Sequence, residues 1–267
     1  MRKINIIMLL AFLPIFAIGQ QRYSVVLAAF SSLEVSSDLN INYAQSPEFD
    51  INVEGPDDAK RGIQIDIDKK GVLRFIVDKS VSLKEIKVFI KAPLLENITL
   101  GKASTMTFDT DIDASKAKVS ITLTDDAEIN AKKISAKQLN VSLRNNSIFK
   151  SNATAKGMNI DARGKSKLNF AGDVGAMKLS ARDNAQISIE KLKGKSLSAN
   201  AAGSSAINVS FDGKSGSASS SGSATIQLVG KAGKAALEAE DNSSIDIRKL
   251  TCKSVKTATK KAGVIVR

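Results

Sequence analysis

The sequence predicts an all-β protein that is built, over most of its length, as a β-solenoid. Three observations predict this fold. Short runs of alternating apolar and polar residues fill residues 23–100, this part shows no helical periodicity, and a unit of 19–20 residues repeats from Gly101 onward. The 267 residues can bury a sizeable core without disulfides, and the one cysteine, Cys252, is expected to be a packed residue rather than a reactive thiol.

The first 19 residues are typical of a secretory signal peptide. Arg2 and Lys3 precede an apolar run over residues 6–16, and Ala17 and Gly19 place small residues at the −3 and −1 positions of a cleavage site before Gln20. The run is short for a membrane span, and no second apolar run of that kind follows, so a retained anchor helix is the weaker alternative. No cysteine stands at the cleavage site to carry a lipid. We therefore expect export to the periplasm or the outer cell surface, with no transmembrane segment after cleavage.

Residues 20–100 are expected to form an irregular N-terminal β region, or cap, that is continuous with the repeats of residues 101–267. Its alternating runs predict five strands, and the cluster from Gly55 to Asp58 predicts a turn. The predicted strands lie at residues 33–35, 39–43, 49–53, 63–67 and 86–90.

The repeats begin with residues that enter a left-handed backbone conformation at little cost, so each beginning predicts a corner. They start at Gly101, Asp125, Asn145, Gly164, Asp183, Gly203, Gly222 and Asp241. The third residue of each is small, which suits a tight corner: Ala103, Ala127, Ser147, Ser166, Ala185, Ser205, Ala224 and Ser243. The first repeat is longer than the others, and its alternating pair is out of register. About eight coils of 19–20 residues are predicted, stacked about 4.8 Å apart.

The segment Ser215–Thr225 resembles a flexible linker in composition, because it is made almost wholly of Ser, Gly and Ala. Its register argues for a structured coil, since Gly216, Ala218 and Ser220 stand where Leu197, Ala199 and Ala201 stand one coil earlier. We expect a coil with a thin core.

The stretch from Val88 to Gly101 leads directly into the small-residue corners. It consists of an apolar strand, a Pro-Leu corner at Pro93-Leu94 and the strand Ile98-Thr99-Leu100. It resembles the putative auto-transporter adhesin head GIN domain family, found largely in Bacteroidetes. The resemblance extends from about Phe30 to Val266. It implies a signal peptide and a right-handed, single-stranded parallel β-helix, and it brings no catalytic or binding residues with it.

Basic residues recur at fixed places in the repeat. Five lysines share one register, two residues before the second apolar run: Lys137, Lys156, Lys195, Lys214 and Lys253. Three arginines end successive coils at another position: Arg144, Arg163 and Arg182. With a net charge of +12, these rows form a candidate surface for an acidic envelope polysaccharide or another polyanion. The alternative is that they only solvate the rod and block sheet aggregation.

Composition excludes several classes of enzyme. The chain has no His and no Trp and only two Tyr, which excludes serine–histidine hydrolases, zinc–histidine sites and an aromatic-lined sugar cleft. Asp109, Asp111 and Asp113 form the best carboxylate cluster, either a calcium site or solvated turn residues. Nucleic acid is not expected as a partner, because the basic residues are not interleaved with aromatic ones. We predict an exported, adhesin-like or scaffold binding module without catalytic residues, cofactor or metal; a β-helix polysaccharide lyase or hydrolase is the alternative.

The register can be tested at one inward position. Replacing Ile187 with Asp should bury an unpaired carboxylate between coils and cost several kcal/mol of folding free energy. A thermal melt of the purified variant measures this loss. Melting at the parent's temperature would contradict the assigned register.

Overall fold

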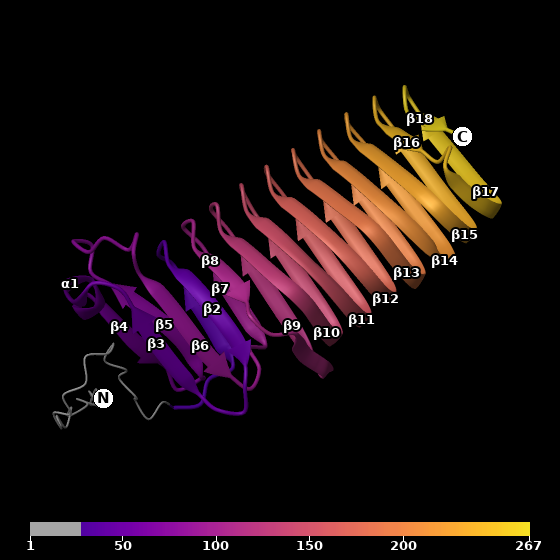
Figure 1. Ribbon diagram of the computed structural model, residues 1–267. Coiled ribbons are helices and arrows are strands. Elements are labelled where there is room, and N and C mark those ends of the chain that lie inside the picture. Colours follow the sequence, from indigo (N-terminus) through magenta and orange to yellow (C-terminus); the bar gives the residue numbers. More distant parts are fainter. Residues whose placement is uncertain (1–27) are drawn as a thin grey trace.

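The computed structural model describes residues 28–267, so the predicted signal peptide lies outside the described part. Over these residues the chain is almost entirely β and winds into a rod of about eight turns, with one short helix, α1, at the N-terminal end (Figure 1). The predicted all-β solenoid is confirmed. The strands before the long repeats are β1 Ser32–Val35, β2 Asn40–Gln45, β3 Asp50–Glu54, β4 Ile63–Ile67, β5 Val72–Val77, β6 Lys87–Ala92, β7 Asn97–Leu100 and β8 Thr105–Phe108; α1 spans Asp57–Arg61.

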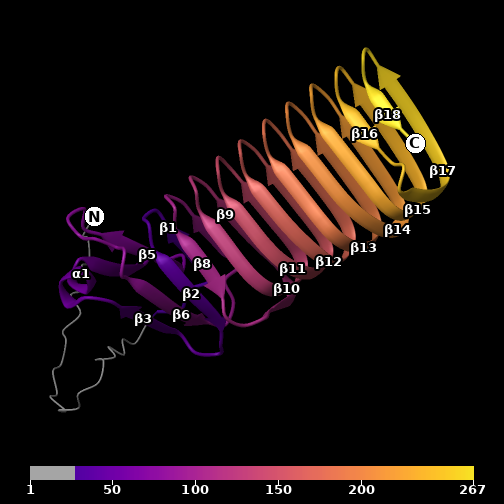
Figure 2. The same ribbon diagram turned by 45° about the horizontal axis from the view of Figure 1, so that its top comes forward.

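The long strands of the repeat each cover most of a coil and bend at its corners, as the two views of the rod show (Figures 1 and 2). From β9 to β15 each pairs in parallel with the next coil. The long strands are β9 Ile112–Leu123, β10 Glu128–Leu143, β11 Ile148–Ala162, β12 Lys167–Ala181, β13 Gln186–Ala201, β14 Ala206–Ser220, β15 Thr225–Glu240 and β17 Leu250–Lys260. Two strands of three residues, β16 Ser244–Asp246 and β18 Val264–Val266, complete the last coils.

The N-terminal region contains the five predicted strands and two elements that the pattern did not predict. β1, β2, β3, β4 and β6 coincide with the predicted runs to within a few residues. β5 was missed because its sequence, VLRFIV, does not alternate strictly, and Ile76 within it is 53% exposed. α1 occupies part of the predicted turn, and its five residues are too few to show a helical period.

The order of coils at this end differs from the order along the chain. β1 pairs in parallel with both β5 and β7, and β2 pairs in parallel with both β6 and β8. The first coil is therefore enclosed between segments that follow it by 40 residues or more. β3 and β4 then run antiparallel to β6 and β5 and complete the cap.

Left-handed backbone conformations mark the corners, as predicted. Seven of the eight predicted first residues have positive φ: Asp125, Asn145, Gly164, Asp183, Gly203, Gly222 and Asp241. The assignment at Gly101 was wrong, because the positive φ values there belong to Lys102 (51°) and Ala103 (60°). The longer first repeat shifts its corner by one residue.

A small side chain is buried behind each of the eight corners from Lys102 to Asp241. The row is Ser104, Ala127, Ser147, Ser166, Ala185, Ser205, Ala224 and Ser243, and each member is at most 1% exposed or fully buried. Ser104, rather than the predicted Ala103, occupies the position in the first repeat. The serines differ in their bonding: Ser243 Oγ accepts from the Glu240 N–H (3.2 Å) and donates to the Glu240 carbonyl (2.7 Å). Within residues 28–267, the buried hydroxyl of Ser166 has no hydrogen-bond partner.

The serine- and glycine-rich segment is a coil of the solenoid. Gly216, Ala218 and Ser220 pair with Leu197, Ala199 and Ala201, which confirms the predicted register. The expected thin core was wrong, because Phe211, 2% exposed, fills the space. A Cβ on Gly213 would lie 2.2 Å from the Phe211 ring, whereas one on Gly216 would lie at an ordinary 3.9 Å from it. One large ring thus replaces the side chains that glycine removes.

Phe211 should therefore contribute more to the stability of its coil than a single inward side chain contributes in the neighbouring coils. We expect Phe211→Ala to cost about 3–5 kcal/mol of unfolding free energy in urea denaturation, since it leaves a cavity lined by glycines. Ile76→Ala, at an exposed position, is the control and should change stability little. A variant at position 211 that unfolds at the parent's urea concentration would show that the ring does not fill the core.

The two corner serines provide a second test. Ser243→Ala should lower the unfolding free energy by about 1–2 kcal/mol, because it removes a hydroxyl that donates and accepts within the corner. Ser166→Ala should leave stability unchanged or raise it, because the hydroxyl it removes is buried without a partner. Equal losses in both variants would contradict the difference in bonding.

Candidate functional site

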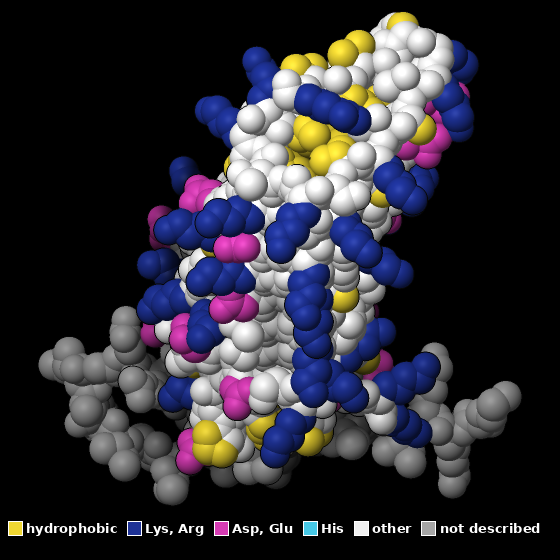
Figure 3. Space-filling model, turned by 90° about the vertical axis from the view of Figure 1, so that its right-hand side faces the viewer, with side chains coloured by type: hydrophobic (Ala, Val, Ile, Leu, Met, Phe, Trp, Pro, Cys, Tyr) yellow, Lys and Arg dark blue, Asp and Glu magenta, His cyan; other side chains and the backbone are white. Residues whose placement is uncertain are grey.

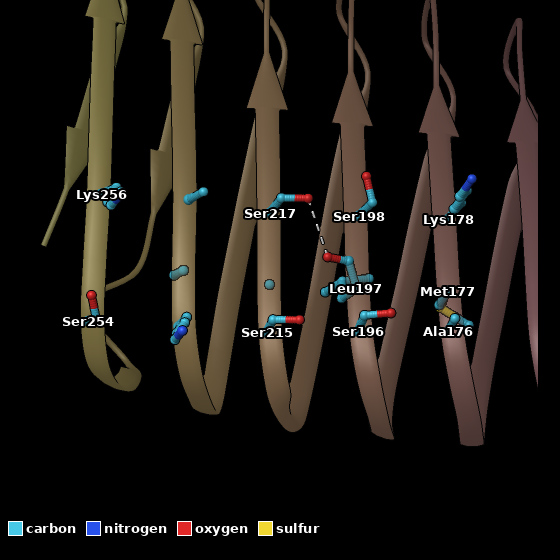
Figure 4. A pocket seen from close by; sticks show the side chains of 14 residues that line it. Ala176, Met177, Lys178, Ser196, Leu197, Ser198, Ser215, Ser217, Ser254 and Lys256 are labelled. Carbon is cyan, nitrogen blue, oxygen red and sulfur yellow. Dashed lines mark hydrogen bonds between the residues drawn. The ribbon is translucent and has the colours of Figure 1, made fainter.

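One long face of the rod carries small polar side chains. We call it the serine face: the outward-facing residues on the second half of each coil, from β9 to β17. Figure 4 shows part of it, with Ser196, Ser198, Ser215 and Ser217 projecting from neighbouring strands. Each row crosses the coils in register, and the central row is Ser120, Asn140, Asn159, Lys178, Ser198, Ser217, Ala236 and Lys256.

Two shallow hollows lie along the serine face. The first, about 610 Å³, extends from Ser120 and Asn140 to Asn200, and Arg182 lies at its edge. The second, about 460 Å³, extends from Ala176 to Ser254 and has Ser196, Ser215 and Lys234 in its lining. Lys178 borders both hollows. The first hollow is lined largely by hydroxyl and amide groups, whereas the second is mostly apolar, with Met177, Leu197 and Ala235 between its serines and lysines.

The predicted lysine row lies at the corner that borders this face. The strand pairing of the residues just before and just after each lysine places the members of the row opposite one another in neighbouring coils. Two glycines occupy the same position in the coils between them, so the row reads Lys137, Lys156, Gly175, Lys195, Lys214, Gly233 and Lys253. All five lysines are exposed. Among the residues that the structure describes, none of the five forms an ion pair. Figure 3 shows Lys and Arg side chains in columns along the rod.

The two glycines divide the row into doublets, Lys137/Lys156 and Lys195/Lys214. A Cβ on Gly175 would lie 2.5 Å from the Lys156 carbonyl oxygen, and one on Gly233 would lie 2.6 Å from that of Lys214. The backbones of successive coils therefore approach too closely at these points for any side chain. The gaps also limit like-charge repulsion, which is about 1 kcal/mol for neighbouring ammonium groups in water-like surroundings.

The predicted arginine row shares one register, but its members differ in what they contact. Arg144 donates to the Asp161 carboxylate (2.7 Å) and to the carbonyl oxygens of Leu143 and Asp161. Arg163 lies 3.4 Å from the same carboxylate. Arg182 forms no ion pair within residues 28–267. Asp161 thus binds two of the three guanidinium groups. The third, that of Arg182, lines the first hollow and has no carboxylate partner among the described residues.

The candidate carboxylate cluster does not converge. Asp109 accepts hydrogen bonds from the Asn42 amide, and Asp113 accepts from the Ser115 backbone N–H, a bond that lowers the pKa of Asp113. Within residues 28–267 no group of three or more His, Cys, Asp or Glu side chains could hold a metal ion. Cys252 is half-buried, with its thiol 3.1 Å from the Ser254 carbonyl oxygen. Asp161 is the one carboxylate that lines either hollow of the serine face, and the two arginines occupy it.

The serine face was not predicted from the sequence, although its signal was present. Three residues after the lysines of the row, the sequence has Asn140, Asn159, Ser198 and Ser217, and Lys178 holds this position in the coil between Asn159 and Ser198. The contact of Arg144 with Asp161 carried no such signal, since the two residues belong to different coils.

No helix of the described chain is long and apolar enough to cross a membrane. No curated protein matches the chain.

Several crystal structures share the fold. A putative adhesin from Bacteroides fragilis is 20% identical, with a TM-score of 0.50, and one from Parabacteroides merdae is 14% identical, with a TM-score of 0.65. A protein from Parabacteroides distasonis described as a putative lipid binding protein is 9% identical, with a TM-score of 0.60. Each match covers 90% of this chain and 95–96% of the other. At these identities the likeness shows the fold alone.

The family model described as "Putative auto-transporter adhesin, head GIN domain" matches residues 29–173 and 175–264. These ranges include the cap, every corner from Lys102 to Lys261 and the whole serine face. The chain therefore belongs to the putative auto-transporter adhesin, head GIN domain family.

Proposed function

We propose that the chain is an exported, non-enzymatic binding module of the cell envelope, and that its serine face holds an anionic glycan. One observation carries the proposal. Rows of outward hydroxyl and amide groups, with apolar patches between them in the second hollow, are bordered by five exposed lysines without ion-pair partners among the described residues and by Arg182. Membership of an adhesin family supports a role at the cell surface.

The chemistry of this surface suits a sugar polymer. Ser and Asn side chains both donate and accept hydrogen bonds, as sugar hydroxyls require of a partner. Coils about 4.8 Å apart present the same groups again at each step, so an extended polymer can bind at several places at once. The lysines then select glycans that carry carboxylates or sulfates over neutral ones, through exposed pairs worth about 0.2–1 kcal/mol each.

A polysaccharide lyase or hydrolase is less well supported. Glycoside hydrolysis uses two carboxyl groups on either side of the scissile bond. Of the residues that line the hollows only Asp161 carries a carboxylate, and it is engaged in ion pairs with Arg144 and Arg163. We expect a polyuronate incubated with the protein to keep its chain length.

The lysine row provides the main test, with alginate as the anionic probe and dextran as the neutral one. Changing Lys137, Lys156 and Lys195 together to Ser should weaken alginate binding about tenfold at low salt, because three weak charge contacts are lost. Binding of the parent should also weaken steeply with added salt. Isothermal titration or surface plasmon resonance measures both effects.

The matched control changes three exposed lysines of the cap, Lys69, Lys70 and Lys79, to Ser, with the same loss of charge. This variant should bind nearly as the parent does. Lys178→Ser, between the two hollows, should weaken binding on its own. If the parent does not bind alginate, or if both triple variants retain its affinity, the lysine row serves only to keep the rod soluble.

A further inference from the structure

The last coil of the rod has an unpaired edge. β17, with 11 residues, pairs with β15, and β18 pairs with β16; within residues 28–267 neither has a strand on its other side. At the opposite end the outermost strands, β3 and β4, are five residues each and are joined by α1. The C-terminal end therefore presents the longer row of free backbone donors and acceptors.

The inward-facing residues of the last coil become polar at this edge. Leu237 of the preceding coil pairs with Thr257, and Ala239 pairs with Thr259. Both threonines are exposed, and Val255 is half-buried. Threonine and valine favour extended backbone, so β17 keeps a regular strand without Pro or Gly. An edge of this kind is ready to pair with one more strand.

The charge at this edge has a single sign. Residues 247–267 contain seven Lys and Arg and no Asp or Glu. Lys260 pairs with Glu238, and Lys261 donates to Asp241 (2.6 Å), a bond that lowers the pKa of Asp241. Lys253 and Lys256, on β17 itself, form no ion pair among the described residues. A second copy of this edge would set like charges against one another, so self-pairing is opposed.

We propose that the free edge of β17 binds an extended acidic peptide segment of a partner protein by strand addition. The backbone of the segment would complete the ladder, and its Asp or Glu side chains would lie against Lys253 and Lys256. Lys253 and Lys256 also belong to the proposed glycan surface, so the two sites meet at the last coil. They differ in that the peptide site needs the free backbone edge of β17.

The probe is a fluorescein-labelled ten-residue peptide of alternating Glu and Val, measured with the full-length mature chain by fluorescence anisotropy. Binding should slow amide hydrogen exchange within residues 250–260. The double charge reversal Lys253→Glu with Lys256→Glu should weaken binding about tenfold or more. The control, Lys137→Glu with Lys156→Glu, makes the same change of charge in the lysine row of two distant coils and should change binding twofold at most.

A second peptide of the same sequence, N-methylated at every residue, keeps every charge but has no backbone N–H left to donate on either edge. It should not bind. Equal binding of the methylated peptide, equal weakening by the two double variants, or unchanged exchange at residues 250–260 would each overturn the proposal. So would dimerisation of the chain alone at 150 mM salt with β17 protected, since the edge would then belong to a second copy.

Discussion

Every coil of the repeat except the last hydrogen-bonds its backbone to the coils on both sides, and the register of that pairing is held at one corner. There a residue of positive φ is followed by a small side chain that is buried at every turn. A larger side chain at that place would push the corner outward and separate the coils, because the interior is already close-packed. The inward apolar rows, the serine face and the lysine row all follow from this register, since each is a set of positions counted from the corner.

The repeating part was predictable because its signals are local. Gly, Asn and Asp reach the left-handed conformation easily, so the corners from Asp125 to Asp241 could be read along the chain. Lys102, Ala103 and Lys261 adopt the same conformation without belonging to these residue types, which is why the first corner was misplaced. The position of β1 between β5 and β7 could not be predicted, since no sequence repeat of fixed length links Ser32 with its partner Val72.

The same distinction holds for the candidate site. The lysine row was predictable because one residue type recurs at one position. The serine face mixes Ser, Asn, Lys and Ala, so its common feature is location on a face and not identity. Phe211 illustrates a third case, because its role depends on what Gly213 and Gly216 lack in its own coil. That the Phe211 ring fills the space left by two glycines can be seen only in the folded coil, where the ring and the glycines come together.

The enclosed first coil sets an order for assembly. In the repeat, partners stand about 20 residues apart, so each coil can form on the one before it with a short loop to close. β1 must instead wait for β7, with Ser32 opposite Asn97, and for β5 on its other side. In a chain that emerges N-terminus first, β1 would therefore lack a partner on one edge until β5 has emerged and on the other edge until β7 has emerged. Under mechanical load applied through the N-terminus, this same segment is gripped on both edges, so it cannot peel away as an outermost strand would.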